Sequence, residues 1–291
     1  MLLALAAIWG SSFMFIKVAV EEVTPGVVVW GRVLIGTLAL LPAVPLLIRW
    51  RRLWSELRRY AFPLAVLGVV NASVPFWLLA WGEKRLDSGL AAVLQASTPL
   101  FTAVVAFGFS RVDRVTGARL AGVVIGFFGV ALLVGVQPEG DVLSALAVLG
   151  SAFCYAASAI YAGARLQQAA PIVTSVGTLA IATLATLPLG VAQLPEAAPS
   201  WKAIGSIVTL GAVGLSIAYI LYFGLIAGAG ASYAVLVTYL VPALALGYGA
   251  VFLDEPVTAS ALAGLALILV GVGLGTGTLR LPRRAPVGET P

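Results

Sequence analysis

The residues that could hold a small molecule are polar and aromatic side chains placed inside long apolar stretches. An amide or hydroxyl group is costly in hydrocarbon, and a Trp or Tyr ring near the middle of a membrane needs a hydrogen-bond partner. We therefore expect these side chains to face the interior of a helix bundle or a water-filled cavity. The candidates for substrate binding are Trp9, Ser12, Lys17, Asn71, Trp77, Gln95, Tyr155, Tyr219, Thr238 and Tyr239.

The chemistry that this set favours is reversible binding of a small, partly apolar zwitterion such as an amino acid. The neutral groups that can meet its charged ends are Ser12, Asn71, Gln95, Tyr155 and Thr238. The rings that can form the walls are Trp9, Trp77, Tyr219 and Tyr239. A ring over an ammonium contributes about 0.5–2 kcal/mol. Neutral contacts discriminate little between molecules of similar size, so we expect broad and weak recognition.

Two basic residues, Lys17 and Arg32, lie inside apolar stretches. In one interpretation both side chains extend to the outer headgroups, or Lys17 pairs with Glu21 one helical turn away. In the other, a cation faces the mouth of a cavity and meets a carboxylate there. Lys17 is the cation that could make the binding of a zwitterion more selective if its helix turns the side chain inward.

Pro99 and Pro242 each interrupt a long apolar stretch near its middle. Proline has no N–H, so the carbonyl groups of Gln95 and Thr238 lose their helical partners. One hypothesis is that both helices bend at these gating hinges when access alternates between the two sides. The alternative is a static kink whose free carbonyl is met by a neighbouring side chain.

The sequence lacks the side chains that intramembrane catalysis needs. It has no histidine and one cysteine, Cys154, so a Ser–His or Cys–His pair is impossible and a metal site would lack its usual ligands. None of the predicted spans has a central Asp or Glu, which removes the usual carrier of a proton relay. We expect a protein that is not an enzyme, with no metal and no cofactor, in which flux follows the substrate gradient.

Composition places the chain in the membrane. Of its 291 residues 61% are hydrophobic and 10% are charged, and apolar runs of about 20 residues recur along its length. The predicted fold is all-α and integral to the membrane. The ten predicted spans cover 2–20, 27–48, 61–81, 88–109, 116–136, 142–164, 172–193, 203–225, 231–253 and 258–279.

The sequence contains two copies of a five-helix repeat. Ser88 to Pro99 has the same length as Ala231 to Pro242, and the sequence at 113–116 (DRVT) is echoed at 255–258 (EPVT). An odd number of spans per unit inverts the second copy in the membrane, which is typical of transporters. The predicted domains are a first repeat at 1–140, an inverted second repeat at 141–279, and a cytoplasmic tail at 280–291.

The distribution of Lys and Arg predicts the orientation. Twelve lie in the loops and tail that share a side with both termini, and three, Lys84, Arg85 and Lys202, lie on the other side. Both termini are therefore expected in the cytoplasm. The net charge of +5 follows from this topology, so the expected partners are the lipid bilayer and a small-molecule substrate, and not nucleic acid. The residues leave a monomer and a homodimer equally open.

The chain resembles the EamA type of the drug/metabolite transporter superfamily over nearly its whole length. The resemblance rests on the first-span sequence at 9–13 (WGSSF) with Lys17, on Arg32, on 91–99, and on the duplicated loop motifs. It implies a ten-helix carrier that moves small metabolites, often exporting amino acids across the bacterial inner membrane. The abundance of Trp and Tyr is similar to that of YddG-type exporters of aromatic amino acids and viologen dications.

Other functions stay open at this point. The substrate could be a nucleoside, a sugar or a drug cation, and the protein could be a membrane protein without transport activity. A channel would need a continuous polar or charged file, and the spans have no ring of like charges.

Overall fold

The computed structural model describes residues 1–109, 117–135, 141–234 and 236–276. Within these ranges every regular element is a helix. Seven helices or runs of helices are long and apolar enough to cross a membrane, and three shorter apolar helices cover 119–135, 237–252 and 259–275. The expected all-helical membrane architecture is thus confirmed. The predicted span ends at 116, 136 and 277–279, the motif at 113–116 and the tail at 280–291 lie outside the described residues.

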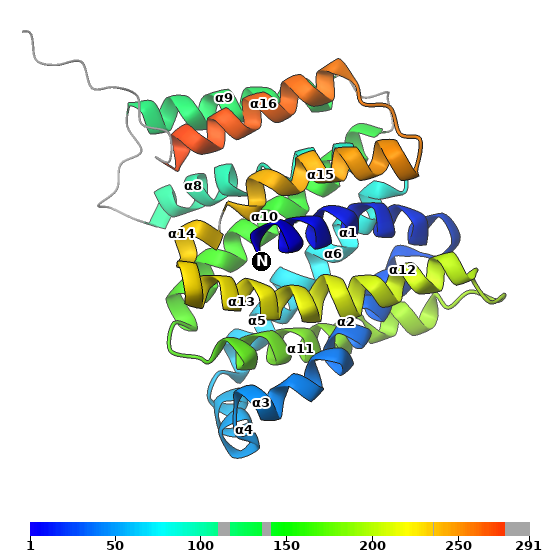
Figure 1. Cartoon of the computed structure of the whole chain (residues 1–291), viewed down its shortest axis with the longest axis vertical. Coiled ribbons are helices and arrows are strands. Elements are labelled where there is room, and N and C mark those ends of the chain that lie inside the picture. The colour runs from blue at the N-terminus through cyan, green and yellow to red at the C-terminus, as the bar shows by residue number, and fades with distance from the viewer. Residues whose placement is uncertain (110–116, 136–140, 235, 277–291) are drawn as a thin grey trace, which may run out of the picture.

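The helices of the first half follow one another with short connections (Figure 1). They are α1 (Leu2–Glu22), α2 (Pro25–Leu40), η1 (Leu41–Ala43), α3 (Val44–Leu47), α4 (Trp50–Arg59), α5 (Ala61–Leu67), η2 (Gly68–Ser73), α6 (Val74–Glu83), α7 (Ser88–Gln95), α8 (Thr98–Phe109) and α9 (Ala118–Gly135). Those of the second half are α10 (Asp141–Arg165), α11 (Pro171–Ala192), α12 (Trp201–Gly211), η3 (Ala212–Ile217), α13 (Ala218–Ala229), α14 (Ala231–Ala234), α15 (Val237–Phe252) and α16 (Ala259–Gly275).

Two spans contain a π-helical turn at matching positions in the two halves. One is η2, between α5 and α6, and the other is η3, between α12 and α13. Ser73 Oγ donates to the carbonyl of Gly68 at 2.8 Å, whereas Ser216 Oγ donates to the carbonyl of Gly36 in α2 at 2.7 Å. A π-turn inside an α-helix often marks a functional position, and here each one lies near the middle of its span.

The helices pack in pairs that correspond between the halves. α1 contacts α12 and α15, while α10 contacts α6, α7 and α8; α2 packs on α11, and α7 on α15. α9 and α16 lie side by side at the upper end of Figure 1, where they also contact α8. Their close approach needs glycine, because a Cβ on Gly122 would lie 2.5 Å from the amide nitrogen of Gly275.

Two local features differ from the sequence analysis. The third span was expected to end at residue 81, but α6 continues to Glu83, whose side chain is fully buried. Residues 50–59, expected in a loop, form the helix α4. Its strongly basic sequence contains Arg51, Arg52, Arg58 and Arg59, and a charged amphipathic helix of this kind suits a membrane surface.

Candidate functional site

A cluster around Arg32 brings together side chains from four spans. The guanidinium carbon lies 4.0 Å from the ring centroid of Phe76, and the Phe76 ring lies 6.2 Å from that of Tyr155. Tyr155, Tyr219 and Glu83 lie within electrostatic range of the guanidinium. Arg32 is 6% exposed, and its Nε has no hydrogen-bond partner in the described part of the chain. The outward-extending interpretation of Arg32 is therefore wrong: the side chain is held inside the bundle.

Polar residues of the predicted set pair with neighbours on adjacent helices or turns. Asn71, in η2, accepts a hydrogen bond from Ser158 of α10, with an Oγ–Oδ1 distance of 2.7 Å. Gln95 donates from Nε2 to the Thr98 hydroxyl at 3.3 Å, while its Oε1 is buried with no partner among the described residues. The buried hydroxyl of Ser12 donates to the carbonyl of Ile8 in its own helix at 3.0 Å. Asn71 and Gln95 are both half-buried.

The predicted aromatic residues contact several different neighbours. Trp9 donates from Nε1 to the carbonyl of Gly214 in η3 at 3.3 Å, and its ring lies 5.5 Å from that of Tyr222. Trp77 stacks on Trp81, with centroids 6.4 Å apart. The hydroxyl of Tyr239 is buried and has no partner in the described part of the chain. Thr238, its neighbour in α15, is exposed.

The two proline positions differ in their local structure. Pro99 is the second residue of α8, which is separated from α7 by Ala96 and Ser97. The carbonyl of Gln95, freed by Pro99, accepts a hydrogen bond from the Thr98 hydroxyl at 2.8 Å. Pro242 lies inside α15. The structure therefore shows a neighbour meeting the freed carbonyl in the first half, the feature expected of the static alternative.

Lys17 contacts main-chain carbonyl groups at the C-terminal end of α6. Its Nζ donates to the carbonyls of Glu83 and Leu86, both at 3.0 Å. A cation is favourable there because the last carbonyls of a helix lack partners and carry partial negative charge. Lys17 makes no ion pair with Glu21 within 4.0 Å, since the described residues contain one such pair, Arg52–Glu56.

The same end of the molecule is closed by a contact between the two halves. Glu255 accepts hydrogen bonds from the amide nitrogens of Ser88 and Gly89 at 2.8 and 3.1 Å, at the start of α7. Gly89 packs on Leu246 of α15, so closely that a Cβ would lie 2.8 Å from it. Beside this contact, burial and then the Glu255 carboxylate raise the pKa of Asp87. We call this set of contacts, with Lys17, the seal.

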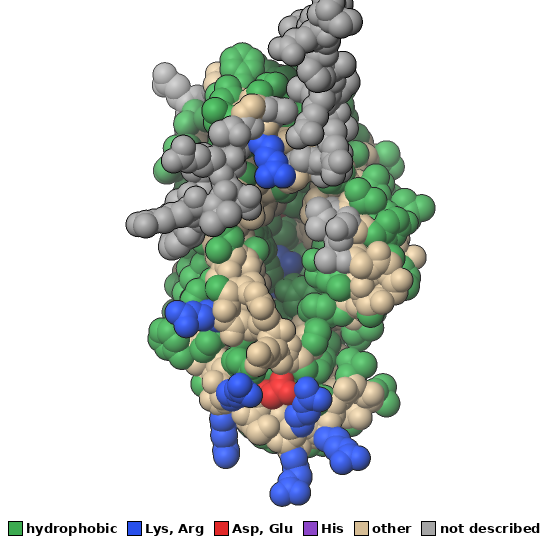
Figure 2. Space-filling model, turned by 90° about the vertical axis from the view of Figure 1, so that its left-hand side faces the viewer, with side chains coloured by type: hydrophobic (Ala, Val, Ile, Leu, Met, Phe, Trp, Pro, Cys, Tyr) green, Lys and Arg blue, Asp and Glu red, His purple; other side chains and the backbone are tan. Residues whose placement is uncertain are grey.

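The opposite end, which carries α4, is hollowed. Figure 2 views this end, and its middle shows a depression with a basic side chain visible in its depth. The two halves of the chain thus touch at the seal, and the depression lies at the opposite, basic end.

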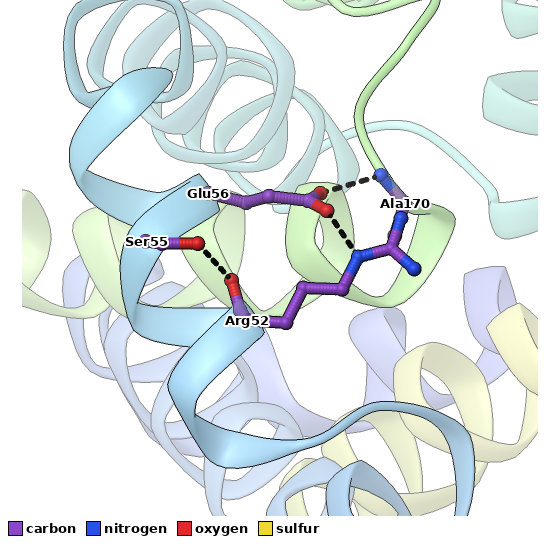
Figure 3. A network of polar contacts seen from close by, with 4 residues as sticks. All are labelled: Arg52, Ser55, Glu56 and Ala170. Carbon is purple, nitrogen blue, oxygen red and sulfur yellow. Dashed lines mark hydrogen bonds and ion pairs between the residues drawn. The ribbon is translucent and has the colours of Figure 1, made fainter.

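The rim of the basic end is fixed by a small polar network on α4 (Figure 3). Glu56 accepts from Arg52 Nε at 2.6 Å and from the amide nitrogen of Ala170 at 2.9 Å. The Ala170 amide, and to a lesser degree Arg52, lower the pKa of Glu56. The network ties α4 to the turn before α11.

Three residues of the cluster around Arg32 are absent from the binding set predicted from the sequence. They are Arg32 itself, Phe76 and Glu83. The signal for Arg32 is a charge inside an apolar run, and the signal for Glu83 is the unbroken helical sequence from residue 74 to 83. In the described part of the chain, no three His, Cys, Asp or Glu residues gather as metal ligands would.

A helical membrane protein with one hollowed end, one sealed end and polar groups between them has the build of a membrane transporter. Comparison with known proteins agrees with this class. The profile of the EamA-like transporter family matches residues 1–135 and again residues 142–276. The chain therefore belongs to the EamA-like transporter family.

Individual relatives share most of their length with the chain. An uncharacterized transporter of Archaeoglobus fulgidus is 26% identical, covering 89% of this chain and 91% of the relative. The uncharacterized inner membrane transporter YedA of Escherichia coli is 30% identical, covering 90% and 80%. A probable terminal-alkyne amino-acid exporter of Streptantibioticus cattleyicolor is 27% identical, covering 89% and 86%. A crystal structure that is 17% identical superposes with a TM-score of 0.68 over 96% of both chains, which shows a shared fold.

Proposed function

We propose that the protein is an alternating-access carrier that moves amino acids, aromatic or otherwise apolar ones foremost, and exports them across the bacterial inner membrane. The observation that carries this proposal is the combination of a hollowed basic end with a seal built from both halves. Alternating access requires one closed side at a time. The name of the Streptantibioticus relative, a probable amino-acid exporter, supports the substrate class.

In this proposal the chain is two inverted five-helix repeats, 1–140 and 141–279, around a central path. The double match of the family profile supports the duplication, as do the corresponding helix contacts and the paired π-turns. Both termini lie in the cytoplasm, because the basic residues gather at the hollowed end. Pro99 and Pro242 act as gating hinges, one in each repeat.

Flux of purified protein in liposomes tests the proposal. Saturable uptake of labelled L-phenylalanine that is accelerated by unlabelled L-phenylalanine on the other side is the expected result, because a carrier exchanges its substrate. Steady single-channel currents would contradict it. A thermal-shift screen with amino acids, nucleosides and sugars selects further substrates, and a nucleoside or sugar hit without amino-acid flux would replace the substrate class.

Net flow follows the substrate gradient in this proposal, since no Asp or Glu lies near the middle of a described span. Uphill uptake driven by an imposed pH gradient alone would contradict that statement. If such uptake were observed, Glu83 would be the carboxylate to replace by mutation. It is buried at the end of α6, and neither of its carboxylate oxygens is hydrogen-bonded to a described residue.

A further inference from the structure

The Arg32 side chain is charged, buried and without a counterion within 4.0 Å among the described residues. It is 94% enclosed by the protein, and Arg52–Glu56 is the one ion pair within 4.0 Å in the described ranges. A buried charge without a partner costs several kcal/mol. Phe76 covers one face of the guanidinium at 4.0 Å, which offsets part of this cost, but a ring face offers no acceptor to the N–H groups.

The unmet hydrogen-bonding capacity points to an anion. Arginine has five N–H donors in a planar fork that matches a carboxylate. Arg32 Nε has no partner in the described part of the chain, and nearby Tyr155 and Tyr219 add phenol groups that can donate as well. These groups come from α2, α10 and α13, so both halves of the chain contribute to the cluster.

The carboxylate that lies within electrostatic range does not satisfy Arg32. Glu83 is fully buried, yet neither of its oxygens has a hydrogen-bond partner among the described residues, and it forms no ion pair with Arg32. Glu83 therefore does not serve as the partner of Arg32. A guanidinium left without a carboxylate partner among the described residues suits a substrate that carries a carboxylate better than a dication, which Arg32 repels.

We infer that Arg32 binds the carboxylate of the transported molecule, so that the carrier takes substrates bearing a carboxylate and excludes dications. The inference rests on the proposed carrier function and gives it a recognition element. The neutral set expected from sequence then serves the rest of the substrate, and Arg32 supplies the strongest single contact.

The first test uses the wild-type protein in liposomes with three probes of one shape. L-Phenylalanine has both charged ends, L-phenylalaninamide lacks the carboxylate, and 3-phenylpropanoate lacks the ammonium. We expect L-phenylalanine to be transported, 3-phenylpropanoate to compete with it, and L-phenylalaninamide to do neither. Equal competition by L-phenylalaninamide would overturn the role of Arg32 and leave the carrier function intact. Absence of saturable flux for all three would overturn both.

The second test replaces the guanidinium. Loss of a hydrogen-bonded charge pair corresponds to about a 10- to 100-fold rise in the apparent KM for L-phenylalanine in Arg32→Gln. Arg32→Lys keeps the charge but loses the planar fork of N–H donors. Its apparent KM should therefore lie between those of the wild type and Arg32→Gln. Arg51→Gln, an exposed arginine of α4, is the matched control and should keep the wild-type KM. A well-folded Arg32→Gln protein with unchanged KM and unchanged discrimination against L-phenylalaninamide would overturn the inference.

Discussion

Glu255 and Ser88, which are 167 positions apart in the sequence, are directly hydrogen-bonded. The Glu255 carboxylate accepts from both the amide nitrogen and the hydroxyl of Ser88, each at 2.8 Å. The carboxylate thereby caps the first turn of α7 from the opposite half of the chain. A cap of this kind contributes about 0.5–2 kcal/mol, and a negative charge at a helix N-terminus adds to it. The bond exists in the closed arrangement of the seal, so it favours that arrangement.

We predict that Glu255→Ala shifts the protein toward opening at the seal. The reporter is a cysteine in place of Ala91, which is fully buried in α7, in a background with Cys154→Ala. Its labelling by a membrane-impermeant maleimide should become about tenfold faster, which corresponds to about 1.4 kcal/mol. Glu196→Ala, an exposed carboxylate, is the control. Equal labelling in all three backgrounds would show that Glu255 does not stabilise the closed state.

Lys17→Met is predicted to destabilise the whole protein. The ammonium meets two main-chain carbonyls, and a hydrogen bond to a charged group is worth about 1.5–3 kcal/mol. The apparent Tm in detergent should fall by about 3–10 °C. Lys84→Met, which removes an exposed lysine nearby in sequence, should change the Tm little. If both variants melt like the wild type, the Lys17 contacts are not formed in detergent.

Replacement of the two hinge prolines is predicted to slow transport. Alanine restores the missing N–H and favours a straighter helix, so Pro99→Ala and Pro242→Ala should bias the protein toward one state. A bias of about 1 kcal/mol changes the population ratio about fivefold. Pro188, inside α11, offers a matched control that is not a predicted hinge. Wild-type turnover in both hinge variants would leave the static kink as the correct interpretation, in line with the Thr98–Gln95 bond.

The membrane-spanning, all-helical architecture could be predicted from the sequence because it depends on quantities that the sequence displays directly. Apolar runs set the spans, and Asn71 and Gln95 had to face inward because an amide in lipid is costly. The all-helical membrane architecture agrees with the structure, in which Asn71 and Gln95 are half-buried. The break after Gln95 also follows from Pro99, although the sequence does not show that Thr98 meets the freed carbonyl.

The positions of Arg32 and Glu83 could not be derived in the same way. Whether a charge near a helix end faces lipid, headgroups or the interior depends on helix rotation and on which helix packs beside it. Phe76, which covers Arg32, lies 44 positions along the chain, and no local pattern links the two. Glu83 lies two residues beyond the predicted end of its span, within the ordinary error of a boundary.

The network on α4 predicts a pH dependence of stability. Hydrogen bonds hold the pKa of Glu56 below its ordinary value of about 4.3. The stability that the ionised Glu56 carboxylate contributes is therefore present above that value and is lost as the pH falls through the lowered pKa. Glu56→Gln should lose stability at neutral pH, by about 1 kcal/mol or less because the pair is solvated, and should differ less from the wild type near pH 3. Melting curves between pH 3 and 7 check this, with Glu196→Gln as control. A difference that grows on acidification would contradict the assignment.

The role of the neutral groups is tested by alanine in place of Asn71, Gln95, Trp77 and Tyr239. Each variant, checked for folding by size exclusion, should raise the apparent KM or lower flux if its side chain contacts substrate. Unchanged kinetics in all four would place the path on other faces of these helices.

Asn71 needs a sharper experiment because it already has a partner in the protein. Its Oδ1 accepts from Ser158 at 2.7 Å, so Asn71→Ala could act through packing alone. If the bond is only structural, Ser158→Ala and Asn71→Ala should each cost about 0.5–1.5 kcal/mol of stability and change KM equally. If the amide also binds substrate, Asn71→Ala should raise the KM beyond Ser158→Ala, and the double variant should match Asn71→Ala. Since Ser158→Ala leaves the amide in place but frees its oxygen, a KM raised equally by both single variants would reduce Asn71 to a supporting residue.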